Sequence, residues 1–253
     1  MPRFFSKTSL AELVPGQEIC LTDAVFHHAV RVCRLKSDDA CTLFDGNGNA
    51  WGVTLTSIDK RRGLARVESR LSSTPPPSFP ITLVLAVTAT ERMDWTLQKG
   101  TELGAAAFLP FYSEHSNARL NDARQERRFE HWQAVIVSAC EQCGQNRLPR
   151  LSPPETFEAI LKTAADDASA LRLFLDADAQ HALPDVLRNA RVLSPPTQAF
   201  LMIGPEGGFT SDEIRAAQTA GWQAVRLGTR ILRAETAAAA AITLVQAAFG
   251  DLA

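Results

Sequence analysis

The sequence predicts an α/β protein of two parts, a small N-terminal β-barrel and a larger domain with a mainly parallel sheet. Short strands with closely spaced turns fill residues 1–72, as in a barrel. Residues 73–80 contain three consecutive prolines, which stiffen a linker. In residues 81–253, apolar strands alternate with helices, and this alternation is the pattern of a parallel sheet.

The N-terminal part is predicted from turn chemistry and short apolar runs. The segment DGNGN favours a tight hairpin turn, and DKRRG is a second turn. The predicted elements in chain order are strand 17–22, helix 24–35 capped by Asp23, and strands 40–44, 50–58 and 64–71.

The larger part begins with a run of apolar and β-branched residues that is typical of a buried strand. Thr210 and Glu213 have the spacing of a capping box, and Gly221 ends the helix that they begin. The predicted elements in chain order are strand 81–89, helix 91–103, strand 107–111, helix 121–143, helix 156–165, strand 171–175, helix 183–190, strand 200–203, helix 210–220, strand 223–227 and helix 234–249.

Two of these strands each deliver a glycine-bearing loop in front of a helix. The first loop is GPEGG, residues 204–208, and the second is GTRILR, residues 228–233. A single loop of this kind is commonly a tight turn. Both loops, however, lie at the carboxyl ends of strands, where α/β proteins bind ligands. Their bare backbone N–H and C=O groups can therefore hydrogen-bond a small molecule.

Composition and motifs exclude several classes of protein. A formal net charge of −2 gives no bulk basicity, and there is no signal-type or membrane-spanning run, so we expect a cytoplasmic protein without a membrane partner. The five cysteines suit a reducing compartment. We expect no metal site, because Cys140 and Cys143 lack a second pair and His27 and His28 face different ways on a helix.

Particular segments of the chain then resemble one family. In the larger part the resemblance is carried by IGPEGGFT, LGTRILRAETA, WTLQKGTELGAAAFLPFYSEHS and HWQAVIVSACEQCGQNRLPRL. In the N-terminal part it is carried by RFF, FHHAVRVCRLKSDD and TLFDGNG. Together they resemble the SPOUT-class methyltransferases, in particular the family that methylates N3 of a uracil in 16S ribosomal RNA. The chain departs from the family pattern at His115, at Gln145-Asn146 and at Ala234, where Arg, an Arg-containing sequence and Thr are usual.

The resemblance implies a fold, a cofactor and partners. It implies that the barrel is PUA-like and binds RNA, and that the C-terminal part forms a deep trefoil knot. It implies S-adenosylmethionine as the cofactor and 16S ribosomal RNA or the small ribosomal subunit as the partner. It also implies a homodimer formed through the C-terminal part.

Candidate site residues follow from the two loops and the chemistry. To methylate uracil N3, a catalyst could remove the proton on N3, or it could stabilise the negative charge on O2 and O4 once the proton leaves. Arg230 and Arg233 are predicted to stabilise that charge, and Glu206 to take the proton. The alternatives are a salt bridge from Arg233 to Glu235 and a turn role for Glu206. The residues predicted to bind the cofactor are Leu175, Ile203, Gly204, Pro205, Glu206, Gly207, Gly208, Leu227, Gly228, Ile231 and Leu232. Of these, Gly207 is expected to need a backbone angle that a β-branched side chain resists.

Basic residues of the N-terminal part are candidates for contact with RNA phosphates. They are Arg3, Arg31, Arg34, Lys36, Arg61 and Arg62. The alternative is an ordinary solvated, charged surface.

Other functions stay open at this point. The fold could serve a non-enzymatic RNA-binding protein, or a methyltransferase that acts on a different RNA position. A dinucleotide-dependent enzyme is disfavoured, because no GxGxxG follows the first strand of the larger part.

Overall fold

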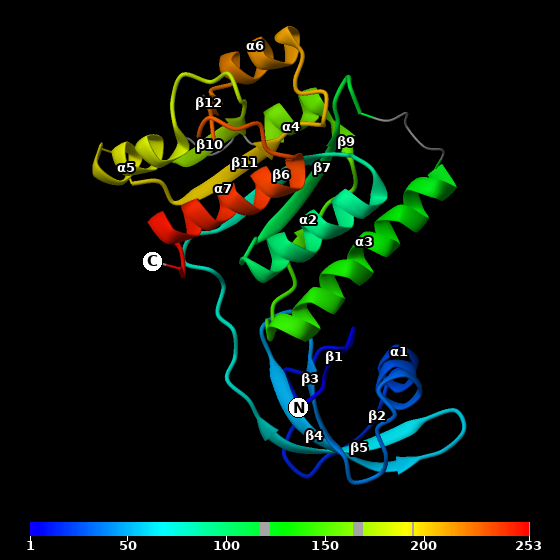
Figure 1. Ribbon diagram of the computed structural model, residues 1–253. Helices are drawn as coiled ribbons and strands as arrows, with labels where there is room; N and C mark the ends of the chain where they lie inside the picture. Colours follow the sequence, from blue (N-terminus) through cyan, green and yellow to red (C-terminus); the bar gives the residue numbers. More distant parts are fainter. Residues whose placement is uncertain (117–121, 164–168, 194, 253) are drawn as a thin grey trace. The chain divides into compact units, whose positions relative to one another are not determined.

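The computed structural model describes residues 1–116, 122–163, 169–193 and 195–252 (Figure 1), and the chain divides into two compact units. The N-terminal unit contains Met1–Pro76 and Val137–Leu148. The C-terminal unit contains Pro77–Ile136 and Pro149–Ala253. The predicted division at 1–72, 73–80 and 81–253 placed the segment Val137–Leu148 in the larger part, whereas the structure places it in the N-terminal unit. As a division into functional domains, these boundaries stay a prediction.

The N-terminal unit is built on a five-stranded sheet in the order β1-β3-β4-β5-β2. Strands β3, β4, β5 and β2 pair antiparallel, and β1 adds to β3 in parallel. The elements are β1 (Arg3–Phe5), β2 (Glu18–Cys20), α1 (Asp23–Phe26), the π-helix η1 (His27–Val32), β3 (Ala40–Phe44), β4 (Ala50–Ile58) and β5 (Gly63–Arg70). The predicted hairpin at 40–44 and 50–58 is confirmed.

The predicted helix 24–35 differs from the structure at its start and along its length. The cap is Thr22, whose hydroxyl accepts a hydrogen bond from the N–H of Val25 at 3.4 Å, so the prediction of Asp23 as the cap is wrong. Thr22 has the extended backbone of a cap, whereas Asp23 is already helical. After one α-turn the chain widens into η1, a form that is rare and frequent at functional sites.

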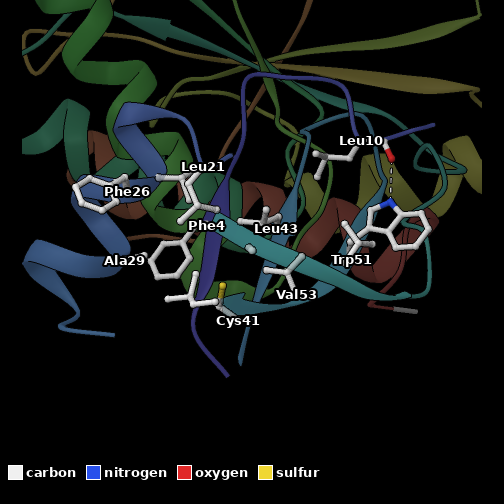
Figure 2. Close-up of a cluster of buried hydrophobic side chains, with 13 residues drawn as sticks. Phe4, Leu10, Leu21, Phe26, Ala29, Cys41, Leu43, Trp51 and Val53 are labelled. Carbon is white, nitrogen blue, oxygen red and sulfur yellow. Dashed lines mark hydrogen bonds between the residues drawn. The ribbon is translucent and has the colours of Figure 1, made fainter. Parts of the chain in front are cut away.

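A hydrophobic core of buried side chains from the sheet and α1 lies inside the N-terminal unit (Figure 2). Phe4 of β1 lies in it, which explains why a strand of three residues is retained. The indole N–H of Trp51 donates to the carbonyl oxygen of Leu10 at 2.8 Å, so this large side chain is buried with its polar atom satisfied.

The segment Val137–Leu148 contributes to the same unit at the β3–β4 hairpin. Cys140 is buried against Phe44 and Ala50. The N–H of Leu148 donates to the carbonyl oxygen of Gly46 at 2.9 Å, and the N–H of Phe5 donates to Glu141 Oε1 at 3.0 Å. The end of the long helix α3 (Asp122–Cys143) is thus part of the N-terminal unit.

The C-terminal unit is built on a seven-stranded sheet in which every recorded pairing is parallel. The strand order is β12-β10-β11-β6-β7-β8, and β9 also pairs with β7. The elements besides α3 are β6 (Ile81–Ala86), α2 (Thr90–Glu102), β7 (Ala107–Tyr112), β8 (Arg150–Leu151), β9 (Glu155–Thr156), α4 (Phe157–Thr163), β10 (Ala170–Leu175), α5 (Leu183–Leu193), β11 (Gln198–Ile203), α6 (Ser211–Thr219), β12 (Gln223–Val225) and α7 (Ala234–Phe249). The α/β class is confirmed. Residue 121 and residues 164–165 of the predicted helices lie outside the described residues.

Helix α7 covers one face of this sheet and packs against β6, β11, α2 and α5 (Figure 1). Its buried residues include Ala238, Ala241, Ile242 and Val245, and the small alanines allow close approach to the strands. A second core, which includes Phe111, Phe157 and Trp222, joins the sheet to α4 and α6. The sheet is therefore covered by helices, as a parallel sheet requires.

Candidate active site

Three neighbouring strands of the C-terminal unit end at one cavity. Strands β12, β10 and β11 are adjacent and parallel, so their carboxyl ends lie at the same edge of the sheet. The loops after them, with part of α2 and α7, line a cavity of about 760 Å³. All the residues predicted for the cofactor or the chemistry line it, except Gly228. The structure thus brings together residues that the sequence places as far apart as Leu175 and Arg233.

The glycine loop, residues 204–208, is held by two different requirements. A Cβ on Gly204 would lie 2.9 Å from the ring of Phe209, so only glycine allows this packing. Gly208 has φ of 72°, a conformation that other residues avoid. A Cβ on Gly207 would make an ordinary contact with His115 at 3.4 Å, and its φ lies outside the left-handed region. The expectation of an unusual angle at Gly207 is therefore wrong, because the turn places that angle at Gly208.

The capping box after the glycine loop is present and does more than begin α6. Thr210 Oγ1 accepts from the N–H of Glu213 at 3.2 Å, and Glu213 Oε2 accepts from the N–H of Thr210 at 2.9 Å. Glu213 Oε1 also accepts from the N–H of Glu114 at 3.1 Å. The ring of His115 adds a hydrogen bond between Nδ1 and the carbonyl oxygen of Gly208 at 3.2 Å. These bonds tie the glycine loop to the loop after β7.

Arg226 fixes the loop on the other side of the cavity. Its Nη1 donates to the carbonyl oxygen of Ala179 at 2.8 Å and to that of Gln180. The backbone N–H of Arg226 donates to the carbonyl oxygen of His181 at 2.9 Å. The loop after β10, which carries Asp176 and Asp178 into the lining, is thereby held to the end of β12.

Sequence reasoning missed several lining residues. Asp176 and Asp178 directly follow the predicted strand 171–175, and that position was the signal that could have found them. Arg226 stands in the predicted strand 223–227, where a lone basic residue gives no signal. Arg92 lies in the first turn of α2, more than a hundred residues from the glycine loop, and nothing in its own segment points to the cavity.

Some charged side chains at the cavity form an ion pair, and others have no partner among the described residues. Glu206 Oε1 forms an ion pair with Nη1 of Arg92. Within the described ranges, Arg230 and Arg233 are exposed and make no side-chain hydrogen bond or ion pair, and no salt bridge joins Arg233 to Glu235. Arg233 is the N-cap residue of α7 through its backbone, with φ of −64° and ψ of 151°. Both guanidinium groups are therefore free to meet a negative charge at the cavity.

The cavity fits a nucleoside-sized cofactor. Its volume lies within the range of small-molecule sites, and apolar side chains such as Leu175, Leu227 and Leu232 offer surface for a flat base. The backbone of the glycine loop offers donors and acceptors, and Asp176 and Asp178 offer carboxylates to hydroxyl or amino groups. Donors and acceptors of this kind suit the adenine, ribose and amino acid of S-adenosylmethionine.

The predicted RNA-binding residues lie in the N-terminal unit in two kinds of environment. Five of them are exposed, namely Arg31, Arg34, Lys36, Arg61 and Arg62. Nη2 of Arg31 donates to the carbonyl oxygen of Lys60 at 2.9 Å, which brings the end of η1 beside the β4–β5 turn. Arg62 is paired there with Asp59 at 3.1 Å. The roles of these residues stay predictions.

Arg3 is in the other environment, because its guanidinium is already used inside the unit. Nη2 donates to the carbonyl oxygen of Gly144 at 3.1 Å and to Asn146 Oδ1. The guanidinium carbon lies 5.3 Å from the centre of the Phe44 ring. These contacts hold the segment after α3, and they leave the predicted role of Arg3 in RNA binding without structural support.

The paired histidines, His27 and His28, and the paired cysteines, Cys140 and Cys143, belong to the N-terminal unit, whereas the cavity belongs to the C-terminal unit. His28 Nδ1 lies 3.3 Å from Glu141 Oε2. Cys140 is buried, and burial raises the pKa of its thiol to about 12, whereas Cys143 is exposed. Among the residues that the structure describes, no three His, Cys, Asp or Glu side chains are grouped to hold a metal ion. None of the described helices combines the length and apolarity needed to cross a membrane.

Comparison with known proteins gives two family matches. Residues 74–246 match an RNA methyltransferase domain, and residues 21–68 match an RNA methyltransferase PUA domain. Curated relatives named ribosomal RNA small subunit methyltransferase E include one from Mycobacterium tuberculosis, 33% identical, covering 86% of this chain and 82% of the relative. Another, from Synechocystis sp., is 31% identical and covers 90% of this chain and 73% of the relative.

Solved structures agree with these matches. The methyltransferase E of Neisseria gonorrhoeae, bound to S-adenosyl methionine, is 35% identical over 100% of both chains with a TM-score of 0.88. A putative methyltransferase of Legionella pneumophila, also in complex with this cofactor, is 30% identical over 98% of both chains with a TM-score of 0.86. The cavity described above therefore belongs to a fold that binds this cofactor in two similar proteins.

Proposed function

The chain belongs to the family of RNA methyltransferases that carry a PUA domain ahead of a methyltransferase domain, and we propose that it transfers a methyl group from S-adenosylmethionine to N3 of a uracil in 16S ribosomal RNA. The observation that carries this proposal is the cavity at the ends of β10, β11 and β12, which is lined by the glycine loop and by Arg230 and Arg233, two arginines without a side-chain partner among the described residues. The names of the relatives support ribosomal RNA of the small subunit as the substrate.

The loops after the three strands hold the cofactor. When bound, S-adenosylmethionine supplies an electrophilic methyl group on a sulfonium. The backbone of residues 204–208 and the apolar side chains of Leu175, Ile203, Leu227 and Leu232 fix its orientation, because positioning is the main contribution of a protein to cofactor chemistry.

The acceptor needs help with charge. As N3 of uracil loses its proton, negative charge spreads over O2 and O4. Arg230 and Arg233 lie at the cavity without partners in the described part of the chain, so they are placed to stabilise this charge. The predicted role of Glu206 as proton acceptor stays a prediction, and its carboxylate is occupied by Arg92.

The N-terminal unit supplies affinity for RNA in this proposal. Arg31 and the β4–β5 turn with Arg61 and Arg62 form one exposed basic group, since Arg31 bonds to Lys60 of that turn. Such a group positions a phosphate backbone without reading the base. We further propose a cytoplasmic homodimer formed through a knotted C-terminal part. A mass of about 27.5 kDa by light scattering at micromolar protein would reject the dimer.

Labelled methyl transfer tests the function directly. The protein is incubated with labelled S-adenosylmethionine and either 16S RNA or small ribosomal subunits, and the modified nucleoside is then identified and mapped. We expect N3-methyluridine at one position. If the labelled methyl group is found on a ribose or on another base, the protein is an RNA methyltransferase with a different target. Cofactor binding without any transfer to either substrate would also reject it.

A further inference from the structure

Arg92 lines the active-site cavity from α2, and no sequence pattern pointed to it. It is the third residue of the helix, whose N-cap is Ala89. A positive charge there opposes the helix dipole, which favours anions at the N-terminus. The stability of α2 therefore does not explain the position of Arg92.

The partner of Arg92 lies on the glycine loop. The ion pair joins Arg92 Nη1 to Glu206 Oε1, 114 residues away in the sequence. The two side chains are 41% and 42% exposed, and an ion pair so exposed adds little to folding stability. What the pair does is connect α2 to the loop after β11, directly at the cavity.

A second carboxylate lies near Arg92 without a partner. Glu235 is in the first turn of α7, and its Oε2 atom is buried and has no hydrogen-bond partner within the described residues. Glu235 and Arg92 line a small cavity of about 10 Å³, together with Thr88 and Thr96. This cavity has room for about one water molecule, so a larger ligand does not fit beside the Glu235 carboxylate. Among the residues lining it, Arg92 carries the positive charge.

Arg92 thus forms an ion pair with one carboxylate, that of Glu206, and lines a small cavity together with a second, that of Glu235. A guanidinium has five N–H donors in a fixed planar arrangement, so it can serve both, which an amine on a flexible stem does less well. We therefore expect Arg to serve at position 92 better than Lys.

We propose that Arg92 is a positioning residue of the methyl-transfer site, which ties the glycine loop to the start of α7 by binding Glu206 and compensating the charge of Glu235. This inference rests on the proposed function. Its consequence is that Glu206 anchors the loop that lines the cofactor cavity. Loss of either Arg92 or Glu206 loosens the same loop, so the effects of the two residues are coupled.

A double-mutant cycle tests the coupling between Arg92 and Glu206. The variants are Arg92→Gln, Glu206→Gln and the double variant, with Arg92→Lys as the conservative change. The matched control is Arg188→Gln on α5, which breaks an exposed pair with Asp185 of 3.0 Å away from the cavity. Cofactor affinity is measured by calorimetry, and single-turnover methylation at saturating cofactor is followed across pH. Circular dichroism reports whether each variant folds.

We expect each single variant to weaken cofactor binding about tenfold, and the double variant to bind no worse than the weaker single one. Arg92→Lys recovers part of the affinity, and Arg188→Gln binds as the parent protein does. Arg92→Gln and Glu206→Gln change the rate at saturating cofactor to the same extent and share one pH profile, because both act on the same loop.

Other outcomes overturn the inference. Additive losses in the double variant would mean that the two residues act separately. A Glu206→Gln variant that binds cofactor normally but loses rate and changes its pH profile would make Glu206 the proton acceptor. If Arg92→Gln does not fold, Glu206→Gln and Arg92→Lys decide the question. A parent protein that does not bind the cofactor would instead reject the proposed function.

Discussion

The two units gather their functional side chains in different ways. In the C-terminal unit, parallel strands all end at one edge, so loops far apart in sequence share one cavity. In the N-terminal unit, strands β3, β4 and β5 are antiparallel, so consecutive turns lie at opposite ends of the sheet. The position of a residue after a strand therefore indicates the site in one unit and does not in the other.

The charges of the two units also differ in what they bind. In the N-terminal unit, Arg3 and Asp45 are used by the fold, because each makes several hydrogen bonds within the unit. At the cavity of the C-terminal unit, Arg230 and Arg233 make none within the part of the chain that the structure describes. We therefore expect changes at Arg230 or Arg233 to act on the methylation rate, and changes at Arg3 or Asp45 to act on the stability of the fold.

The largest expected effect concerns Arg233. If its guanidinium stabilises charge on the uracil, Arg233→Ala lowers single-turnover methylation by roughly a hundredfold, the scale of losing one donor to a transition state. RNA affinity, measured by filter binding, changes much less. Arg188→Ala on α5 is the control for removal of an exposed arginine from the same unit. A normal single-turnover rate for Arg233→Ala would show that Arg233 is not a catalytic residue.

The next effect concerns the backbone of the glycine loop. Gly208→Val forces a β-branched residue to a φ of 72°, which costs about 2 kcal/mol, so cofactor affinity falls roughly thirtyfold. Gly207→Ala is the matched control, because its Cβ meets only an ordinary contact with His115. Calorimetry of the two folded variants compares them. Equal affinities would show that the loop does not need this conformation to bind the cofactor.

Much of the fold could be predicted from local chemistry. Strands 40–44 and 50–58 were found because DGNGN marks the turn between them, and helix 234–249 because an alanine-rich run follows a loop. Strands β1, β8 and β9 were missed, since two or three residues show no period and form only where a neighbouring strand offers hydrogen bonds. The pattern of helix α3 likewise does not tell which unit its last turns join.

The site was predictable for a different reason, and only in part. The lining from Gly204 to Gly208 and from Leu227 to Arg233 followed from two glycine loops and the family resemblance. Arg92 and Arg226 could not be predicted, because their roles come from long-range bonds to Glu206 and to the carbonyl oxygens of Ala179 and Gln180. Long-range contacts of this kind leave no trace in the local sequence.

A smaller effect is expected for the basic group of the N-terminal unit. Replacing Arg31, Arg34, Arg61 and Arg62 by Ala weakens RNA binding about tenfold and flattens its salt dependence by about one unit of slope per lost phosphate contact. Cofactor binding is unchanged, because these residues lie in the other unit. Arg3→Ala is the contrasting variant, since its loss acts on folding. If the fourfold variant binds RNA as the parent does, RNA binds to another surface, and the proposed difference between the two units is wrong.

The smallest effect concerns Asp45 at the β3–β4 hairpin. Burial by itself would raise the pKa of this carboxyl, but hydrogen bonds from the Asn49 side chain and from backbone N–H groups, including that of Asn47, lower it below the usual value. A carboxyl with a lowered folded pKa stabilises the protein above its unfolded pKa of about 3.9, and this stability is lost as pH falls through the folded pKa.

Asp45→Asn should therefore lower the free energy of unfolding by about 1–2 kcal/mol at pH 7, and the difference should begin to shrink as the pH falls below the unfolded pKa of about 3.9 toward the lower folded pKa. Urea unfolding followed by circular dichroism at pH 7 and near pH 3 measures it. Asp59→Asn is the control, because Asp59 accepts similar bonds from the N–H groups of Arg61 and Arg62 in an exposed turn, where water replaces them. The same difference at both pH values would mean that shape rather than charge at Asp45 holds the hairpin. A methylation rate that falls in the folded Asp45→Asn protein would contradict the assignment of this charge to the fold alone.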